Sequence, residues 1–378
     1  MDYSQSYRLI FTSTALFLLL KFITLTVATS NANVIKMIPR KVLSTKTYKS
    51  GWINVGNMHS SRAFHTASLL PDGRVLVTGG DTGTDTTNGT ELYDPSTGLW
   101  TTTGSMHYAR DSHQAMVLRD GKVLVTGGDN SSAEIYNPST GNWTITGSMA
   151  YKRNFHILSL LENGQVLVTG GLDVQTAECR SSAELYNPLT GIWTITGNMK
   201  DSRACHTATV LRNGKVLVTG GISTGSQRYL KSAELYDPST GSWTSADSMR
   251  DMRFFHTASL LDNGKVLVTG GSQDTAELYD PSIGLWAATG SMHYARTNHR
   301  ASMLRNGQVL VTGGAVDTYY VSINSSELYD PATGTWITTN NMQYTRLAHE
   351  ATILKDGRVL VTGGEDGKYL KTTELYYD

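Results

Sequence analysis

The sequence predicts an all-β fold, a seven-bladed β-propeller in which each blade is a four-stranded antiparallel sheet. The first observation is a repeat: Met-x-x-x-Arg-x-x-His, Val-Leu-Val-Thr-Gly-Gly and Glu-Leu-Tyr-Asp-Pro, or close variants, recur seven times at spacings of 43 to 50 residues. The second is that each copy contains four short β-prone segments separated by turn residues. Because one copy cannot bury both faces of its sheet, we expect the copies to close into a ring.

The first two strands of each copy are predicted to form a hairpin. In the first copy they lie at residues 66–70 and 75–77, with Asp72-Gly73 between them. Asp-Gly and Asn-Gly favour a type I′ turn, which needs positive φ at both residues. The second strand is rich in β-branched residues and stops at a glycine pair. The pairs are Gly79-Gly80, Gly127-Gly128, Gly170-Gly171, Gly220-Gly221, Gly270-Gly271, Gly313-Gly314 and Gly363-Gly364.

The third strand carries Glu91-Leu92-Tyr93 in the first copy and ends at Asp94-Pro95, where proline suits the second position of a type I turn. A tryptophan opens the fourth strand of six copies. These are Trp100, Trp143, Trp193, Trp243, Trp286 and Trp336. The seventh copy lacks one, whereas Trp52 stands alone before the first copy. We therefore expect the segment at Trp52 to complete the last blade and close the ring.

The glycine pair, the tyrosine of the third strand and the tryptophan after a proline turn together resemble the kelch-repeat family, over residues 52–378. The Arg-x-x-His and Asp-Gly-Lys-Val-Leu-Val-Thr-Gly-Gly patterns are similar to the propeller of galactose oxidase. The kelch resemblance implies a scaffold that binds other molecules. The galactose oxidase resemblance implies a copper site held by two tyrosines and two histidines, with a cysteine bonded to one tyrosine.

The copper site cannot be assembled from this sequence. There is no Tyr-His dipeptide, and the chain reaches Asp378 as the last blade closes, so we expect no further domain to complete such a site. Gly-x-Ser-x-Gly, His-Glu-x-x-His and phosphate-binding glycine loops are also absent from the sequence. We expect no catalytic residue, no metal and no cofactor, and a carbohydrate oxidoreductase is the less favoured alternative.

One arginine and one histidine recur in every copy, but a shared metal ion is excluded by distance. Neighbouring sheets stand about 10 Å apart, whereas zinc binds nitrogen at about 2.0 to 2.1 Å. A glutamate also recurs at the start of each third strand, and we expect Arg–Glu pairs between adjacent strands or blades. The arginines are Arg62, Arg110, Arg153, Arg203, Arg253, Arg296 and Arg346; the histidines are His65, His113, His156, His206, His256, His299 and His349; the glutamates are Glu91, Glu134, Glu184, Glu234, Glu277, Glu327 and Glu374.

Composition limits the class of partner. The chain has 32 Lys and Arg against 32 Asp and Glu, so its formal net charge is zero. Nucleic acid binding depends on an excess of basic residues, and we expect none here. We expect a monomeric propeller whose partner is a protein or a glycan.

The N-terminus predicts export or a membrane tether. Residues 9–28 are apolar apart from Lys21, and small residues follow. We divide the chain into a signal peptide or membrane anchor at 1–32, a basic linker at 33–50 and the propeller at 51–378. Four sequons support a secreted or membrane-associated extracellular or lumenal glycoprotein. They begin at Asn88, Asn130, Asn142 and Asn324.

A membrane-anchored protein with a cytosolic propeller is the alternative topology. The apolar run is followed by a basic flank without acidic residues. Its members are Lys36, Arg40, Lys41, Lys46 and Lys49. If the anchor is not cleaved, the positive-inside rule keeps this flank in the cytosol. The propeller would then be a cytosolic interaction adaptor.

The two cysteines, Cys179 and Cys205, occupy different positions in their copies. Cys179 follows the second strand of blade three, and Cys205 precedes the first strand of blade four. These positions lie on the same face of neighbouring blades, so a disulfide between them is geometrically reasonable.

Binding specificity is expected on the face that carries the loops between strands two and three, because these loops vary most in length. Long loops in blades three and four and in blades six, seven and one predict two ridges with a shallow cleft between them. The candidate ligand-binding residues on the ridges are Arg180, Arg228, Tyr229, Lys231, Asp317, Tyr319, Tyr320, Lys368 and Tyr369. Two further candidates, Arg300 and Glu350, break the pattern of the residue after the histidine and are also able to pair with each other.

Overall fold

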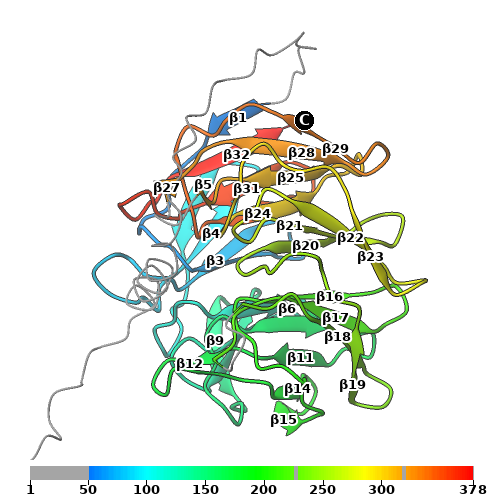
Figure 1. The fold of residues 1–378 in the computed structure, drawn as a ribbon. Helices are drawn as coiled ribbons and strands as arrows, with labels where there is room; N and C mark the ends of the chain where they lie inside the picture. The colour runs from blue at the N-terminus through cyan, green and yellow to red at the C-terminus, as the bar shows by residue number, and fades with distance from the viewer. Residues whose placement is uncertain (1–50, 225–228, 317–320, 378) are drawn as a thin grey trace, which may run out of the picture.

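The computed structural model describes residues 51–224, 229–316 and 321–377, and in this part the chain forms seven four-stranded antiparallel sheets arranged in a ring (Figure 1). The predicted all-β, seven-bladed propeller is confirmed. The segments predicted at 1–32 and 33–50, with the tether at 9–28, lie outside the described residues. Within the described part, no helix is long and apolar enough to cross a lipid bilayer.

The blades follow one another along the chain. Blade one is β2 (Thr66–Leu69), β3 (Val75–Thr78), β4 (Thr90–Asp94) and β5 (Leu99–Thr102); blade two is β6 (Gln114–Val117), β7 (Val123–Thr126), β8 (Ala133–Asn137) and β9 (Asn142–Thr146). Blade three is β10 (Ile157–Leu160), β11 (Val166–Thr169), β14 (Ala183–Asn187) and β15 (Ile192–Ile195); blade four is β16 (Thr207–Val210), β17 (Val216–Thr219), β18 (Ala233–Asp237) and β19 (Ser242–Ala246).

Blade five is β20 (Thr257–Leu260), β21 (Val266–Thr269), β22 (Ala276–Asp280) and β23 (Leu285–Ala288); blade six is β24 (Arg300–Met303), β25 (Val309–Thr312), β28 (Ser326–Asp330) and β29 (Thr335–Thr338). Blade seven is β30 (Glu350–Ile353), β31 (Val359–Thr362), β32 (Thr373–Tyr377) and β1 (Gly51–Asn54). Two long loops form small hairpins of their own: β12 (Leu172–Asp173) with β13 (Glu178–Cys179), and β26 (Ala315–Val316) with β27 (Val321–Ser322).

The first strands of the blades surround the axis of the ring. Each packs against the first strands of its two neighbours, and β2 packs against β30 to complete the circle. The second strands, all Val-Leu-Val-Thr, are buried along their whole length because another blade covers each face. A strand buried on both faces needs a continuous apolar run, which these segments supply.

The ring is closed by the N-terminal strand. Strand β1 pairs with β32, placing Trp52 opposite Tyr376, and Figure 1 shows blue β1 beside red β32. The two rings lie 5.2 Å apart, and Trp52 donates its indole N–H to the Asn340 carbonyl at 2.9 Å. The prediction that Trp52 completes the last blade is confirmed.

Tyrosine and tryptophan of the repeat join neighbouring blades, as expected of core residues. In blade three the rings of Tyr186 and Trp193 lie 5.0 Å apart. Trp193 donates to the carbonyl of Gly147, which follows β9, and the Tyr186 hydroxyl lies 2.8 Å from that of Thr146 at the end of β9; the Trp193 bond is also 2.8 Å long. These contacts bury large apolar area while satisfying the polar atoms of both rings.

The hairpin between the first two strands is confirmed, but the predicted turn type is wrong. Gly73 has φ of 97°, whereas Asp72 does not have positive φ. Gly73 N donates to Leu70 O at 2.9 Å, and Leu70 N donates to the Arg74 carbonyl at 2.8 Å. This is a three-residue loop, a type I turn followed by a left-handed glycine. Pro71 supports it by fixing φ at the second position of the turn.

Candidate functional site

Seven equivalent residues form a closed ring of backbone hydrogen bonds around the axis. Each directly precedes the repeat histidine and has a left-handed φ between 49° and 55°. Each donates its N–H to the carbonyl of its counterpart in the preceding blade at 3.0 to 3.1 Å, beginning with Phe64 N to Ala348 O. The residues are Phe64, Ser112, Phe155, Cys205, Phe255, Asn298 and Ala348. The backbone is therefore uniform here, while the side chains differ.

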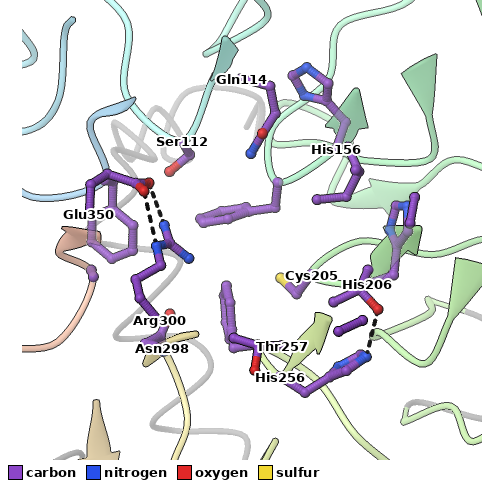
Figure 2. A pocket seen from close by; sticks show the side chains of 18 of the residues that line it. Ser112, Gln114, His156, Cys205, His206, His256, Thr257, Asn298, Arg300 and Glu350 are labelled. Carbon is purple, nitrogen blue, oxygen red and sulfur yellow. Dashed lines mark hydrogen bonds and ion pairs between the residues drawn. The ribbon is translucent and has the colours of Figure 1, made fainter. Parts of the chain in front are cut away.

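These seven residues line the mouth of a cavity of about 290 Å³ on the axis (Figure 2). Below them the wall is formed by the first strands, including Gln114, Ile157, Thr207, Arg300 and Glu350. Because the first strands begin on the face where the second strands end, the pocket opens on the predicted loop-rich face. It lies on the axis, whereas the sequence predicted a cleft between two groups of loops. We call it the axial pocket.

Aromatic side chains converge on one side of the axial pocket. Phe155 meets Phe64 edge to face at 6.1 Å and Phe255 at 5.5 Å. The chain of rings continues from Phe255 to Phe254 at 6.1 Å, and Phe254 stacks on Tyr229 at 4.9 Å. The rings connect the pocket to the loop of blade four, and thus to Tyr229, one of the residues predicted from sequence.

Polar groups come from blades two, six and seven, and in ring order Ser112 and Asn298 flank the arc from Phe155 to Phe255. Arg300 and Glu350 form a bidentate ion pair, with Nη2 to Oε1 at 2.6 Å and Nε to Oε2 at 3.2 Å (Figure 2). Burial raises the pKa of Glu350, and the charge of Arg300 opposes that rise. Ser112 and Asn298 are only 6% and 5% exposed. Within the described part of the chain, the Ser112 hydroxyl and the Asn298 amide nitrogen have no hydrogen-bond partner.

The seven histidines are structural. Each directs Nε2 to a threonine hydroxyl of the preceding blade, as in the 2.8 Å contact between His156 and Thr126. Burial and the nearby arginines lower the pKa of all seven, that of His156 to about 3. They are therefore neutral at physiological pH and bonded through Nε2, while the buried Nδ1 atoms have no partner among the described residues.

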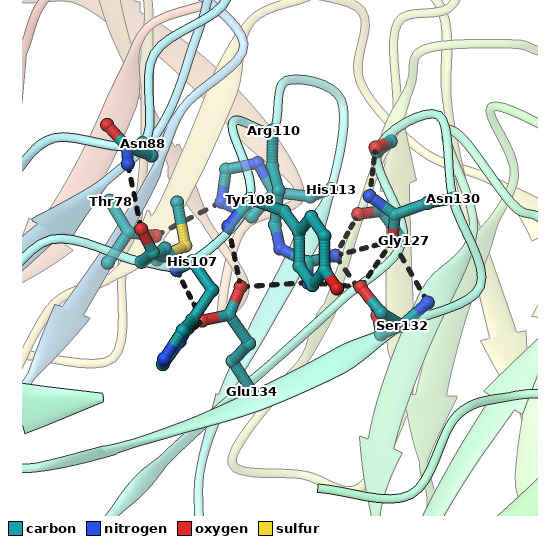
Figure 3. Close-up of polar contacts among 12 residues, drawn as sticks. Thr78, Asn88, His107, Tyr108, Arg110, His113, Gly127, Asn130, Ser132 and Glu134 are labelled. Carbon is teal, nitrogen blue, oxygen red and sulfur yellow. Dashed lines mark hydrogen bonds and ion pairs between the residues drawn. The ribbon is translucent and has the colours of Figure 1, made fainter. Parts of the chain in front are cut away.

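The predicted arginine–glutamate pairs are confirmed in all seven blades, and each lies within one blade. Figure 3 shows the pair in blade two, where Arg110 Nη2 lies 3.0 Å from Glu134 Oε1. Arg110 also donates to the Gly127 carbonyl at the end of β7, and Glu134 accepts from His107 N at 2.7 Å. Because these groups satisfy backbone atoms on both sides, they fix the crossing between blades rather than bind a ligand.

The predicted ridge residues in the described part are partly occupied by contacts within the fold. Arg180 pairs with Asp173 at 2.6 Å and lies over the ring of Tyr151 at 5.2 Å. Tyr369 donates to Asp81 at 2.9 Å, which joins blade seven to blade one. Lys231 and Lys368 are exposed. The structure also shows that Arg300 and Glu350 pair with each other. Arg228, Asp317, Tyr319 and Tyr320 lie outside the described residues.

Sequence reasoning missed the residues at the mouth of the axial pocket. The available signal was the second x of Arg-x-x-His, where the seven copies carry three phenylalanines, a serine, a cysteine, an asparagine and an alanine. Because the residues around it are constant, this position has the same backbone conformation in every copy. Only its side chain differs from blade to blade.

The two cysteines are free thiols in one apolar cluster with Leu172, Ile222 and Phe254. The disulfide considered from sequence is not formed in this structure. Burial raises the pKa of Cys179 to about 12 and that of Cys205 well above its usual value. Thiols protonated this firmly are poor nucleophiles.

The four predicted glycosylation sites differ in accessibility. Asn88 and Asn142 are exposed, whereas Asn130 and Asn324 are half-buried. The amide nitrogens of Asn88 and Asn324, to which a glycan would be joined, donate to Met106 O and Met342 O, both at 2.8 Å. Asn142 lies exposed on the outer strand β9, which makes it the sequon best placed for modification.

The residues of the axial pocket do not fit a copper site. Among the described residues, no group of three His, Cys, Asp or Glu side chains is placed to hold a metal ion. The nearby histidines are bonded to threonines through Nε2, and Glu350, the carboxylate in the pocket, is paired with Arg300. No chemistry through copper is derived for this chain.

Comparison with known proteins agrees with this architecture. A family model for the Kelch motif matches residues 62–107, 163–200 and 203–250. A fungal alcohol oxidase of the AA5 family, solved in complex with copper, is similar in fold at 19% identity and a TM-score of 0.72, over 87% of this chain and 76% of that one. A search of curated proteins gives no match. Because 1053 solved chains share similarity with this one, the fold alone does not select an activity.

Proposed function

Because the chain is a kelch-type β-propeller, we propose that it is a non-catalytic scaffold that binds a partner protein through the axial pocket and the loops around it. One observation carries the proposal. Seven positions have the same backbone conformation and hydrogen bonding, yet they present side chains of five different kinds at one pocket. A rigid frame with variable side chains at a single opening is how repeat rings acquire specificity.

The surface around the pocket supports a protein partner. Tyr108, Tyr151 and Tyr294 lie in the crossings between blades on the loop-rich face and are 46%, 38% and 45% exposed. Each ring is backed by a buried arginine at 5.8 to 5.9 Å, Arg110, Arg153 or Arg296. Exposed tyrosines held rigid from below offer contact area at low entropic cost, which favours them at protein interfaces.

We infer that the scaffold is non-catalytic from the hydrogen bonds, ion pairs and pKa values of the titratable side chains in and around the pocket. The buried histidines are bonded and neutral, the two thiols have raised pKa values, and Arg300 neutralises Glu350. A general acid or base needs a titrating group that can reach the reacting atom. The axial pocket therefore offers recognition rather than proton transfer.

Binding is tested with a displayed library of extracellular proteins and, in parallel, a glycan array, both probed with the full chain. The test variant combines Tyr151→Ser with Phe155→Ala. Alanine is compatible with the left-handed backbone of residue 155, because Ala348 has the same conformation at the equivalent position. The control is Ile195→Ser on the outer strand β15, where the side chain is 63% exposed. Protein binding lost in the test variant and kept in the control supports the proposal. Binding confined to glycans, or lost equally in both, contradicts it.

We place the scaffold outside the cytosol, as the apolar N-terminus and the sequons favour. Expression in a eukaryotic secretory host, followed by glycosidase treatment and N-terminal sequencing, tests this. A mobility shift that is abolished by Asn142→Gln, with a new N-terminus near Asn31, is the expected result. An intact Met1 without glycan would instead indicate the anchored cytosolic adaptor.

A further inference from the structure

The axial pocket selects for an uncharged group. Its two charged side chains, Arg300 and Glu350, are bonded to each other through two contacts of 2.6 and 3.2 Å. A ligand carboxylate or ammonium would have to break this bidentate pair and leave the displaced partner partly buried. Such an exchange is unfavourable because an unpaired buried charge is costly. The pair thus acts as a neutral polar wall.

The wall formed by blades three to five favours a flat apolar group. It carries Phe155, Cys205 and Phe255 at the mouth and Ile157, Ala208 and Ala258 below. The hydroxyl of Thr207 on this wall is already bonded, because it lies 2.8 Å from that of Thr219 and 3.0 Å from His256 Nε2. The phenyl rings meet at interplanar angles of 86° and 81°. One more ring extends this edge-to-face packing.

The polar wall, formed by blades two, six and seven, requires a hydrogen-bonding group. The Ser112 hydroxyl and the Asn298 amide nitrogen are buried at the mouth without a partner among the described residues. Buried polar atoms without a partner destabilise a structure until a ligand or water satisfies them. Serine both donates and accepts and the amide nitrogen donates, so a hydroxyl group can bond to either.

A sugar fits these walls poorly. A hexose carries hydroxyls around its whole edge, and those facing Ile157, Phe255 and Ala258 would lose their hydrogen bonds to water without replacement. The cavity, at about 290 Å³, lies at the small end of ligand sites and holds a single side chain rather than a chain of sugars. A group with one apolar ring and one hydroxyl matches both walls.

We propose that the axial pocket receives a tyrosine side chain presented by the partner protein, with its ring against Phe155 and Phe255 and its hydroxyl bonded at either Ser112 or Asn298. The inference rests on the proposed function, since it names the group by which that partner is recognised. It assigns distinct roles to the two walls: the aromatic wall supplies affinity for any aromatic side chain, and the polar wall supplies the preference for tyrosine.

The test uses two small probes and the intact propeller. N-acetyl-L-tyrosinamide and N-acetyl-L-phenylalaninamide are titrated against protein carrying ¹³C-methyl labels on alanine and isoleucine, with methyl hexosides as a third probe. The reporters are the methyl groups of Ile157, Ala208 and Ala258, which line the pocket, and the control is Ile195 on the outer edge. We expect saturable shifts at the pocket reporters and about tenfold tighter binding of the tyrosine probe.

Variants separate the two walls. Ser112→Ala with Asn298→Ala should reduce the preference for the tyrosine probe to nearly onefold while leaving the phenylalanine probe unchanged. Phe255→Ala should weaken both probes by the same factor. All three substitutions place alanine where Ala348 already adopts the same backbone conformation, so the ring of hydrogen bonds is retained.

Three results would overturn the inference: shifts with hexosides and none with the aromatic probes, equal affinity for the two aromatic probes, or no shift at the pocket reporters. The proposed function is judged apart from this. Suppose that a partner protein loses binding on substitution of Tyr151 and Phe155 but keeps it in the Ser112→Ala, Asn298→Ala variant. That result would support the proposed scaffold function and refute recognition of a tyrosine side chain.

Discussion

At the scale of single residues, the buried arginine–glutamate pairs hold each blade to the crossing that precedes it. In blade four, Arg203 lies 2.7 Å from Glu234, and Glu234 also accepts from Lys200 N at 2.7 Å. Removing one partner leaves a buried charge, so we expect Arg203→Met or Glu234→Gln alone to lower the free energy of unfolding by about 3 to 5 kcal/mol. Urea unfolding of both single variants and the double variant measures their coupling.

The double variant should lose at least about 1 kcal/mol less than the sum of the single losses. The exposed pair Arg358 and Asp356, 2.6 Å apart with side chains 33% and 47% exposed, is the matched control. Its coupling should be about 0 to 1 kcal/mol because water screens it. Purely additive losses at Arg203 and Glu234 would show that the buried pair does not act as a unit.

At the scale of the element, the glycine pair ends strand two so that the next blade can pack against it. Gly170 has φ of 58°, and a Cβ there would collide with the Arg203 carbonyl oxygen and lie 2.8 Å from His206 Cε1. Gly98 has φ of 70° but open space around it. We expect Gly98→Ala to cost about 1 to 2 kcal/mol, from backbone strain alone, and Gly170→Ala clearly more. Equal shifts in Tm would refute the packing role.

Strand β1 is the element that closes the ring. Trp52 and Trp286 make similar contacts, each with a ring about 5 Å from a tyrosine and an indole N–H bonded to a carbonyl at 2.8 to 2.9 Å. Trp52 lies on a four-residue strand held by β32. We expect Trp52→Ala to accelerate amide exchange along β32, and Trp286→Ala to affect β22 much less. Comparable exchange in both would mean that closure does not depend on Trp52.

At the scale of the whole molecule, the seven buried histidines make stability depend on pH. Their folded pKa values lie below 6.5, and those of His156 and His256 are about 3. The unfolded chain therefore binds more protons than the folded one between about pH 3 and pH 6.5, so the stabilisation is complete above pH 6.5 and is lost as pH falls. Each histidine contributes roughly 1.4 kcal/mol per pH unit in that window.

We expect the free energy of unfolding, measured in urea at intervals from pH 7.5 to 5, to be constant above pH 7 and to fall steeply below 6.5. Carboxylates of the unfolded chain have ordinary pKa values of about 4, so they release their protons mostly below this range. Replacing His156 with Asn should reduce the slope by about one proton, whatever it does to the stability at pH 7.5. A flat profile down to pH 5 would contradict this account.

The sequence by itself determined the blades, their number and the closure at Trp52. Each of these depends on local pattern: apolar runs and turn residues define the strands, and the repeat defines the number of blades. The seventh copy lacks its fourth strand, and the segment at Trp52 supplies it. It also placed Arg203 opposite Glu234, because both recur at fixed places in every copy. The type I′ turn was wrong because it assumes a two-residue loop, whereas three residues, Pro71, Asp72 and Gly73, lie between the hydrogen-bonded Leu70 and Arg74.

Only the tertiary structure decided where the candidate site lies. Phe64, Ser112, Phe155 and Asn298 come from four different blades, and nothing in their local sequence shows that they meet. Closing the ring brings them to the axis, where hydrogen bonds between blades hold each in a left-handed conformation. Pairing of Arg300 with Glu350, 50 residues apart, follows from the same closure. Repeats encode the blade locally, whereas a site shared by all the blades exists only in the closed ring.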